Sequence, residues 1–231
     1  YICAAKTWVD GCEQDEVTTH LVNTQAPTLL ARMASQLGSK VVFFSTDYVF
    51  DGSAGPYTES DDCNPLNVYG KSKLEAENAV LDADGNALVI RTTIVYGPEI
   101  LGKNFAYQVA SKLTSKEPFE CLADQYSTPT YNRDLAKMVV RLVEKNCCGV
   151  FNCVGAETMS RYEFACEIAC ALGLDVALLR SKTTPQLENQ ACSEGRIIAK
   201  RGLHLGLCAR KVLGAIDHFK PRSVTESVKH W

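Results

Sequence analysis

The chain has 231 residues, of which 46% are apolar and 22% charged, and its formal net charge is −3. This composition is typical of a globular protein with a substantial core, and it excludes fibrous and disordered classes. The small negative charge gives no reason to expect a nucleic-acid partner or an anionic membrane surface. No apolar run approaches the length that a membrane span requires.

Short apolar runs alternate with amphipathic segments along the chain. The runs predict buried strands at residues 1–5, 41–45, 87–91 and 149–154. Helical spacing predicts helices at residues 15–37, 67–82, 102–116, 132–146 and 160–172, and a closing helix at 223–229. Residues 119–130 are predicted to form a short strand and a loop crossing the site, whereas 181–199 are polar and weakly patterned. This alternation predicts a parallel α/β sheet.

The first predicted helix has an apolar stripe that we expect to face the core, comprising Leu21, Leu29, Leu30, Met33 and Leu37. Pro27 is expected to kink or restart this helix, and Gly38 to end it.

Residues 41–73 carry the candidate chemistry. The strand at 41–45 runs into Ser45 and Thr46, at the edge where parallel sheets place ligands. Tyr69 and Lys73 follow one helical turn apart and share a face. A nearby ammonium favours the phenolate, so we expect Lys73 to lower the pKa of Tyr69 and permit proton exchange with a carbonyl group. Thr46, with Ser45 as the alternative, is expected to hold the substrate oxygen against the phenol.

Five segments resemble, in order, the extended short-chain dehydrogenase/reductase superfamily: STDYVFDG, PYTESD, PLNVYGKSK, RTTIVYG and DQYSTPT. They are similar to the dTDP-4-dehydrorhamnose reductase branch, and the regulatory β subunits of methionine adenosyltransferase carry a similar tyrosine–lysine motif. The resemblance implies an α/β fold with a Rossmann-type parallel sheet, incomplete at its amino terminus, and a smaller substrate-binding lobe. Residues 1–155 would form the second half of the Rossmann domain, and 156–231 the lobe, to which 99–130 contribute.

The resemblance also implies an activity and roles for single residues. The activity is NADPH-dependent reduction of the 4-keto group of a nucleotide-activated deoxysugar, with dTDP-4-dehydro-L-rhamnose as the favoured substrate. Tyr69 would deliver the proton, Lys73 would also contact the nicotinamide ribose, and Thr46 would orient the carbonyl. Further cofactor contacts would be Ala4, Ala5 and Asn23, and substrate contacts would be Asp47, Tyr48, Ile94, Gln125, Thr130 and Arg201.

Several of these roles have structural alternatives that the sequence leaves open. Asp47 and Tyr48 could be structural, Asn23 could bridge helices, and Arg201, if it does not meet a diphosphate, is a solvated side chain. The rhamnose branch commonly carries Trp at the position of Ile94, so the identity of the sugar is open as well.

No GxxGxxG loop occurs in the 231 residues, although this fold uses one after its first strand to hold a pyrophosphate. We therefore expect roughly 60 residues of the family fold to precede Tyr1. The alternatives to an enzyme are a non-catalytic regulatory subunit and a truncated inactive product. The resemblance implies either a homodimer or association with the catalytic subunit of methionine adenosyltransferase.

The eleven cysteines form no CxxC pair and no cluster with metal-ligand spacing. Cys166 and Cys170 share a helix face, which favours packing in the core over ligation. We expect reduced, buried thiols without a bound metal, and hence a cytoplasmic location, with a zinc site or a disulfide framework as the alternative.

Overall fold

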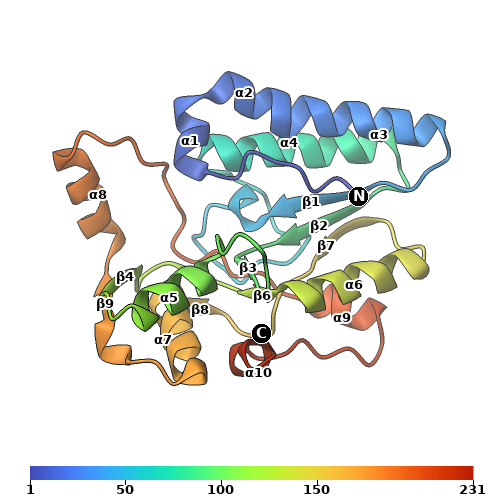
Figure 1. The fold of residues 1–231 in the computed structure, drawn as a ribbon. Helices are drawn as coiled ribbons and strands as arrows, with labels where there is room; N and C mark the ends of the chain where they lie inside the picture. The colour runs from blue at the N-terminus through green and yellow to red at the C-terminus, as the bar shows by residue number, and fades with distance from the viewer. Residues whose placement is uncertain (231) are drawn as a thin grey trace.

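A parallel sheet of three strands lies at the centre of the fold (Figure 1). The computed structural model describes residues 1–230. The strands lie in the order β1 (Val42–Thr46), β2 (Leu88–Thr92) and β7 (Gly149–Asn152), and Thr46 stands directly opposite Thr92. The three predicted strands are therefore confirmed to within a residue or two. The parallel pairing brings the carboxyl ends of β1 and β2 to one edge, as predicted.

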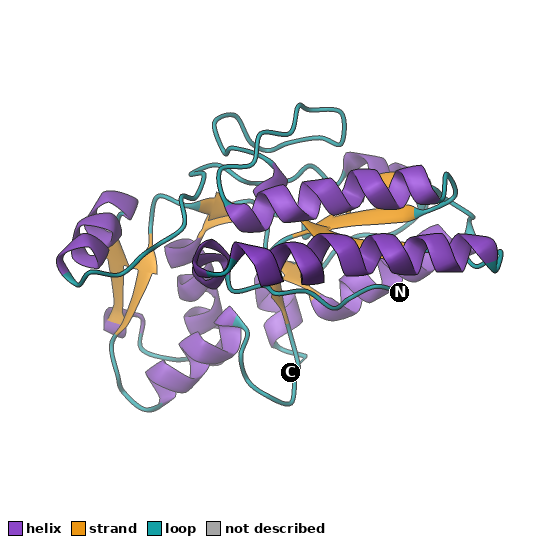
Figure 2. Cartoon of the chain, turned by 90° about the horizontal axis from the view of Figure 1, so that it is seen from above, coloured by secondary structure: helices purple, strands orange, loops and turns teal. Residues whose placement is uncertain are grey.

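Helices cover both faces of this sheet, which explains why its strands are apolar throughout. On one face lie α4 (Val68–Ala83) and α3 (Ala26–Gln36), side by side in the view from above (Figure 2). On the other face lie α6 (Asn132–Glu144) and α9 (Arg210–Ala215). Successive residues of a strand point to opposite faces, so Phe43 joins the α3–α4 core and Val42 joins the α6–α9 core.

A lobe packs beside the sheet, around the fully buried Phe164. Its helices are α5 (Phe105–Thr114), α7 (Arg161–Leu172), α8 (Thr184–Ser193) and α10 (Val224–Val228), and its parallel strand pair is β4 (Phe119–Leu122) with β9 (Leu179–Lys182). A capping box between Ser160 and Glu163 opens α7, where the helix at 160–172 was predicted. The predicted lobe, 156–231, is not continuous, because α9 within it packs on β7 and α6.

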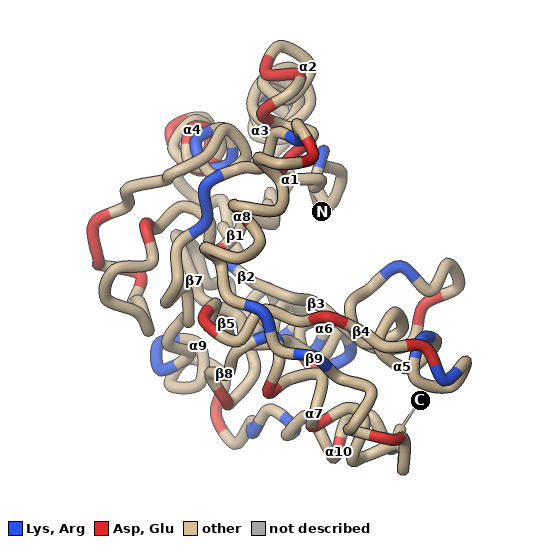
Figure 3. Tube along the Cα trace, turned by 90° about the vertical axis from the view of Figure 1, so that its left-hand side faces the viewer, with Lys and Arg blue, Asp and Glu red and all other residues tan. Residues whose placement is uncertain are grey.

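Shorter elements connect these parts. They are α1 (Val9–Gln14), α2 (Glu16–His20), the π-helical turn η1 (Leu21–Gln25), the 3-10 turns η2 (Asp47–Val49) and η3 (Val176–Leu178), and the strand pairs β3 (Val95–Tyr96) with β6 (Thr130–Tyr131) and β5 (Tyr126–Ser127) with β8 (Met159–Ser160). Basic and acidic residues are both scattered over the trace, in keeping with the small net charge (Figure 3).

The first five residues differ from the predicted buried strand. Only Ile2 bridges to the sheet, where its N–H donates to the carbonyl of Val42 at 2.8 Å. Tyr1 is 70% exposed, and Ala4 is exposed too. The segment lies outside β1, and no other strand of the described chain pairs with its outer side. The segment is therefore paired on one side only and does not form the buried strand that its apolar residues predicted.

The helix predicted at 15–37 forms as α2, η1 and α3, with the restart at Pro27 and a left-handed Gly38 (φ +65°) after its end. Its apolar stripe, however, was wrongly predicted to be buried: Leu29, Met33 and Leu37 are 59%, 52% and 80% exposed. The face turned to α4 and the sheet consists of small or polar residues, namely Thr19, Asn23, Thr24, Pro27 and Ala31. The periodicity of the sequence correctly placed these apolar residues on one side of the helix, but it could not show whether another element covers that side.

The segment 181–199, for which no helix was predicted, contains α8. Its sequence signal was a capping box from Thr183 to Gln186 with Pro185 in the first turn. Among residues 1–230, no helix is long and apolar enough to cross a bilayer. Those residues also contain no group of three side chains suited to hold a metal ion.

All eleven cysteines are free thiols. Cys12, Cys121 and Cys153 are buried, as expected, but the exposed set comprises Cys3, Cys148, Cys170 and Cys192. The prediction that Cys170 lies in the core is therefore wrong, because α7 turns that position outward while Cys166 packs against the lobe core.

Candidate functional site

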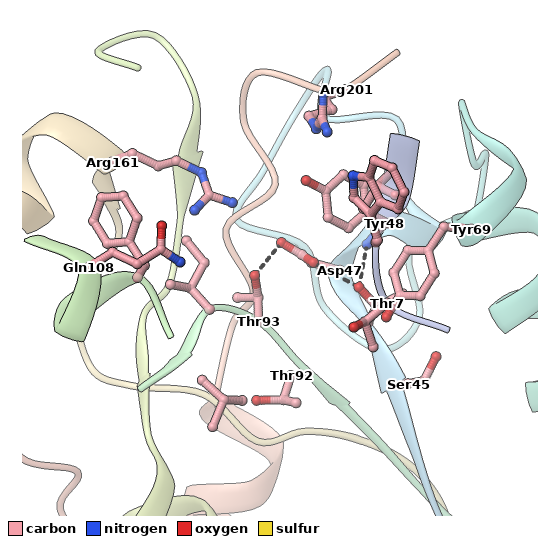
Figure 4. Close-up of a pocket in the computed structure, with 16 residues that line it drawn as sticks. Thr7, Ser45, Asp47, Tyr48, Tyr69, Thr92, Thr93, Gln108, Arg161 and Arg201 are labelled. Carbon is pink, nitrogen blue, oxygen red and sulfur yellow. Dashed lines mark hydrogen bonds between the residues drawn. The ribbon is translucent and has the colours of Figure 1, made fainter. Parts of the chain in front are cut away.

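A cavity of about 780 Å³ lies where the carboxyl ends of β1 and β2 face the lobe (Figure 4). One wall comes from the sheet and α4 and includes Thr46, Asp47 and Tyr69. The opposite wall comes from α5 and α7 and includes Gln108 and Arg161. Both its position and its size are typical of a small-molecule site in an α/β protein.

The first turn of α4 places Tyr69 in the cavity wall. The side chain of Asn67 caps the helix by accepting a 2.8 Å hydrogen bond from the Gly70 N–H. A Cβ at Gly70 would lie 2.1 Å from the Tyr48 carbonyl oxygen, so only glycine permits this close approach. The approach brings the ring of Tyr48 edge-on to Tyr69, with centroids 5.9 Å apart.

The pKa of Tyr69 shifts in the direction opposite to our prediction. Burial raises the pKa of this phenol well above its usual value, although a hydrogen bond with the Thr46 hydroxyl opposes the rise. Lys73 is not among the groups that lower it; the Lys73 ammonium donates a 2.6 Å hydrogen bond to the Phe44 carbonyl and lies 4.0 Å from the Phe43 ring centroid. Burial lowers the pKa of Lys73 itself to about 8. The lysine shares a helix face with Tyr69 without lining the cavity.

Asp47 occupies the centre of the sheet-side wall. Its carboxylate accepts hydrogen bonds from the hydroxyls of Thr46 (3.0 Å) and Thr93 (2.6 Å). Burial raises the pKa of Asp47 to about 6, against the opposing effect of these two bonds and of the positive charge of Arg161.

Two hydroxyls in the same wall are buried without a hydrogen-bond partner in the described chain. They are Ser45 Oγ, at the end of β1, and Thr92 Oγ1, at the end of β2. Both residues line the cavity. Since buried polar atoms are nearly always hydrogen-bonded, this pair marks a place for polar atoms of a ligand.

Five predicted contacts lie away from the cavity of the described structure: Ala4, Ala5, Asn23, Gln125 and Thr130. The Asn23 amide bridges the backbone of Lys6 and the hydroxyl of Ser72, which supports its structural alternative. The Gln125 amide donates to Thr184. The side chains of Gln125 and Thr130 form hydrogen bonds inside the lobe and its connecting turn, and their contact with substrate stays a prediction.

Ile94 and Arg201 line the cavity, and their contact with substrate stays a prediction. Ile94 has φ +40°, which is strained for a β-branched residue. Arg201 pairs with Asp10 at 2.7 Å, so a neighbouring carboxylate already balances its charge.

The structure adds Trp8, Thr93, Gln108 and Arg161, which sequence reasoning missed. Trp8 folds over α1 because Gly11 has no Cβ to block its ring. Arg161 follows a recognisable N-cap, but nothing local indicated that α7 would begin at a cavity.

The parallel α/β architecture of the described chain matches the Rossmann-like fold of NAD(P)-binding reductases. Within that class, the chain belongs to the family described as RmlD substrate binding domain, which it matches over residues 1–213. This family is part of the extended short-chain dehydrogenase/reductase superfamily.

The similar proteins include both a reductase and a regulatory-type subunit, the two classes that the motifs resemble. The chain is 33% identical over 200 residues to a probable low-salt glycan biosynthesis reductase of Haloferax volcanii, covering 84% of this chain and 66% of the relative. It is 37% identical over 188 residues to methionine adenosyltransferase 2 subunit beta of Bos taurus, covering 78% and 56%. It thus spans less than two thirds of the length of these curated relatives.

Solved structures agree on the fold. A dTDP-4-dehydrorhamnose reductase of Clostridium acetobutylicum has a TM-score of 0.86 at 34% identity, covering 99% of this chain and 78% of that one. The reductase of Bacillus anthracis, solved in complex with NADP, has a TM-score of 0.87 at 26% identity, covering 99% and 77%.

Proposed function

We propose that this chain is an NAD(P)-dependent oxidoreductase that reduces the keto group of a nucleotide-activated sugar. The favoured pair is NADPH and the 4-keto group of dTDP-4-dehydro-L-rhamnose. The observation that supports this most strongly is the meeting of the Tyr69 phenol with Thr46 and Asp47 in one ligand-sized cavity at the strand ends. The dTDP-4-dehydrorhamnose reductases among the similar proteins favour the same chemistry.

The residues present fit the nicotinamide end of such a cofactor. The unpartnered hydroxyls of Ser45 and Thr92, together with Tyr69, would hold it, and the bound cofactor supplies hydride to the carbonyl carbon. The Lys73 ammonium donates one of its three hydrogen bonds to the Phe44 carbonyl. We therefore assign Lys73 to holding α4 against β1, next to the place that a ribose hydroxyl of the cofactor would occupy.

The raised pKa of Tyr69 has a direct mechanistic meaning. At neutral pH the phenol keeps its proton, which is the form required to protonate the keto oxygen during reduction. The Thr46 hydroxyl stands beside the phenol and donates its single proton to Asp47. To orient the keto oxygen against the phenol, it would turn that proton from Asp47 to the bound substrate. The same hydroxyl would stabilise the tyrosinate that remains once the proton has moved.

A regulatory subunit is the second candidate. Two observations favour it: the Lys73 ammonium turns away from Tyr69, and Ile94 occupies the position where the rhamnose branch commonly carries Trp. The similarity to methionine adenosyltransferase 2 subunit beta points the same way. In this alternative the partner would be the catalytic subunit of that synthetase, and in the enzymatic reading the natural assembly would be a homodimer.

One assay separates the candidates. The chain and its Tyr69→Phe variant are incubated with millimolar NADPH and dTDP-4-dehydro-L-rhamnose, and the reduced sugar nucleotide is separated by chromatography. We expect Tyr69→Phe to lower turnover by at least about 100-fold, because the proton donor is lost. If the variant keeps more than about a tenth of the turnover, Tyr69 is not the acid. If the wild-type chain gives no product but binds the synthetase catalytic subunit, the regulatory role holds.

A further inference from the structure

Arg161 lines the cavity and is not engaged in a contact ion pair within the described residues. Within residues 1–230, its guanidinium forms no ion pair and no hydrogen bond with the protein, and it lies 5.6 Å from the Phe105 ring centroid. Arg201, the other arginine of the cavity, is paired with Asp10. Figure 4 shows the Arg161 side chain projecting from α7 toward the side of the cavity that holds Thr93 and Asp47. The lobe-side wall thus presents a positive charge that is not held in a contact ion pair, although it acts across the cavity on the Asp47 carboxyl and helps to lower its pKa.

Arg161 also stands between two cavities. It lines the cavity that contains Tyr69 and a second cavity of about 240 Å³, and Phe105 is shared by both. The second cavity has apolar walls from Leu122 and Leu187 and a polar rim from Glu120 and Lys182. It is bounded by β4, β9 and α8, on the side of Arg161 away from the sheet.

The base of the Arg161 side chain is held firmly. Arg161 is the first residue of α7, and its N–H donates to the Gln125 carbonyl at 3.3 Å. The preceding Ser160 and Glu163 satisfy the helix end through the capping box. The backbone of Arg161 is therefore fixed, while the N–H groups of its guanidinium remain available as donors. Such a group suits a phosphate.

We propose that Arg161 binds the diphosphate of the nucleotide-activated sugar where the two cavities meet. The sugar then lies in the larger cavity, facing Tyr69, and the nucleoside lies in the second cavity, against Phe105 and Leu187. This inference rests on the proposed function, because a diphosphate links sugar to nucleoside and must lie between them. It also reassigns the diphosphate contact that the sequence suggested for Arg201.

The test measures binding of dTDP and of inorganic pyrophosphate to the 231-residue chain by calorimetry, without NADPH. We expect Arg161→Gln to weaken dTDP binding at least tenfold, or about 1.4 kcal/mol, and Arg161→Lys to weaken it less. The matched control is Arg180→Gln, which removes the same charge from an exposed position on β9 and should leave the affinity within about twofold. Thermal melting of each variant shows that it is folded.

A second variant tests where the nucleoside lies. Leu187→Trp fills the second cavity and should weaken dTDP binding while leaving pyrophosphate binding unchanged. The proposal is overturned if wild-type chain does not bind dTDP, if Arg161→Gln binds it as well as wild type does, or if Leu187→Trp has no effect. Because these titrations need neither NADPH nor turnover, their failure leaves the reductase assignment standing, and loss of that assignment in the Tyr69→Phe assay leaves the Arg161 result intact.

Discussion

The hydroxyl of Thr93 donates a 2.6 Å hydrogen bond to Oδ2 of Asp47, across 46 residues of sequence. Asp47 is 2% exposed, and its other carboxylate oxygen accepts from Thr46. This carboxyl therefore links the end of β2 to the end of β1 beside Tyr69. Its protonation state is tied both to stability and to the shape of the candidate site.

Asp47→Asn should change how stability depends on pH. The folded-state pKa of about 6 lies above the usual value for an aspartate, so the folded protein binds this proton more tightly than the unfolded chain does. Wild-type stability should therefore fall as the pH rises from about 4 to 6 and stay level above that. The variant lacks this loss and should be about 1–3 kcal/mol more stable at pH 8. Urea unfolding at several pH values checks this, and parallel curves for both proteins would contradict it.

Thr93→Val should shift the titration of Asp47 upward. The hydrogen bond from Thr93 stabilises the carboxylate, so its loss raises the pKa of Asp47 further. The pH at which stability levels off should move up by about one unit, whereas Thr93→Ser keeps the donor and should behave like wild type. The same urea series measures this effect. An unchanged profile in Thr93→Val would mean that the bond has no influence on Asp47.

Gly70→Ala should destabilise the protein by about 1–3 kcal/mol, because its Cβ would press on the Tyr48 carbonyl and force backbone to move. Gly85→Ala is the matched control, since no atom lies within 4 Å of the Cβ that it would add. Chemical denaturation gives both values. Equal stability of the two variants would show that the contact between α4 and the loop is looser than described.

Thiol labelling should divide the cysteines into classes. Cys3, Cys148, Cys170 and Cys192 are exposed and should react in the native protein, whereas Cys12, Cys121 and Cys153 should react only in denaturant. Burial also raises the pKa of Cys121 to about 12, which leaves almost no reactive thiolate. Mass spectrometry after labelling identifies each site. Rapid native labelling of the three buried thiols would contradict the packing.

The 231-residue chain should bind NADPH no more tightly than about millimolar. Its sequence contains no glycine-rich loop of the kind that holds a pyrophosphate, so only the nicotinamide end would be bound. Calorimetric titration measures the affinity. A micromolar value would mean that the described residues suffice for the whole cofactor.

Local patterns predicted the central elements well. The apolar run before Ser45 and the helical spacing from residue 67 each act over a few residues, so β1 and α4 could be placed to within about two residues. The carboxyl ends of parallel strands meet at one edge, which predicted the place of Thr46, and the structure has Thr46 and Tyr69 lining the same cavity.

The amino-acid sequence by itself determined which segments became strands and helices and which residues stand at the strand ends, because propensity, capping and periodicity are local. The tertiary structure alone decided that Leu29 and Leu37 face outward and that Lys73 bonds the backbone of β1. It also decided that Thr93 donates a hydrogen bond to Asp47 and that Arg161 faces Asp47 across the cavity. Each of these depends on which distant segment becomes a neighbour. Burial and charge pairing, and therefore pKa values, are properties of those neighbours and cannot be read from spacing along the chain.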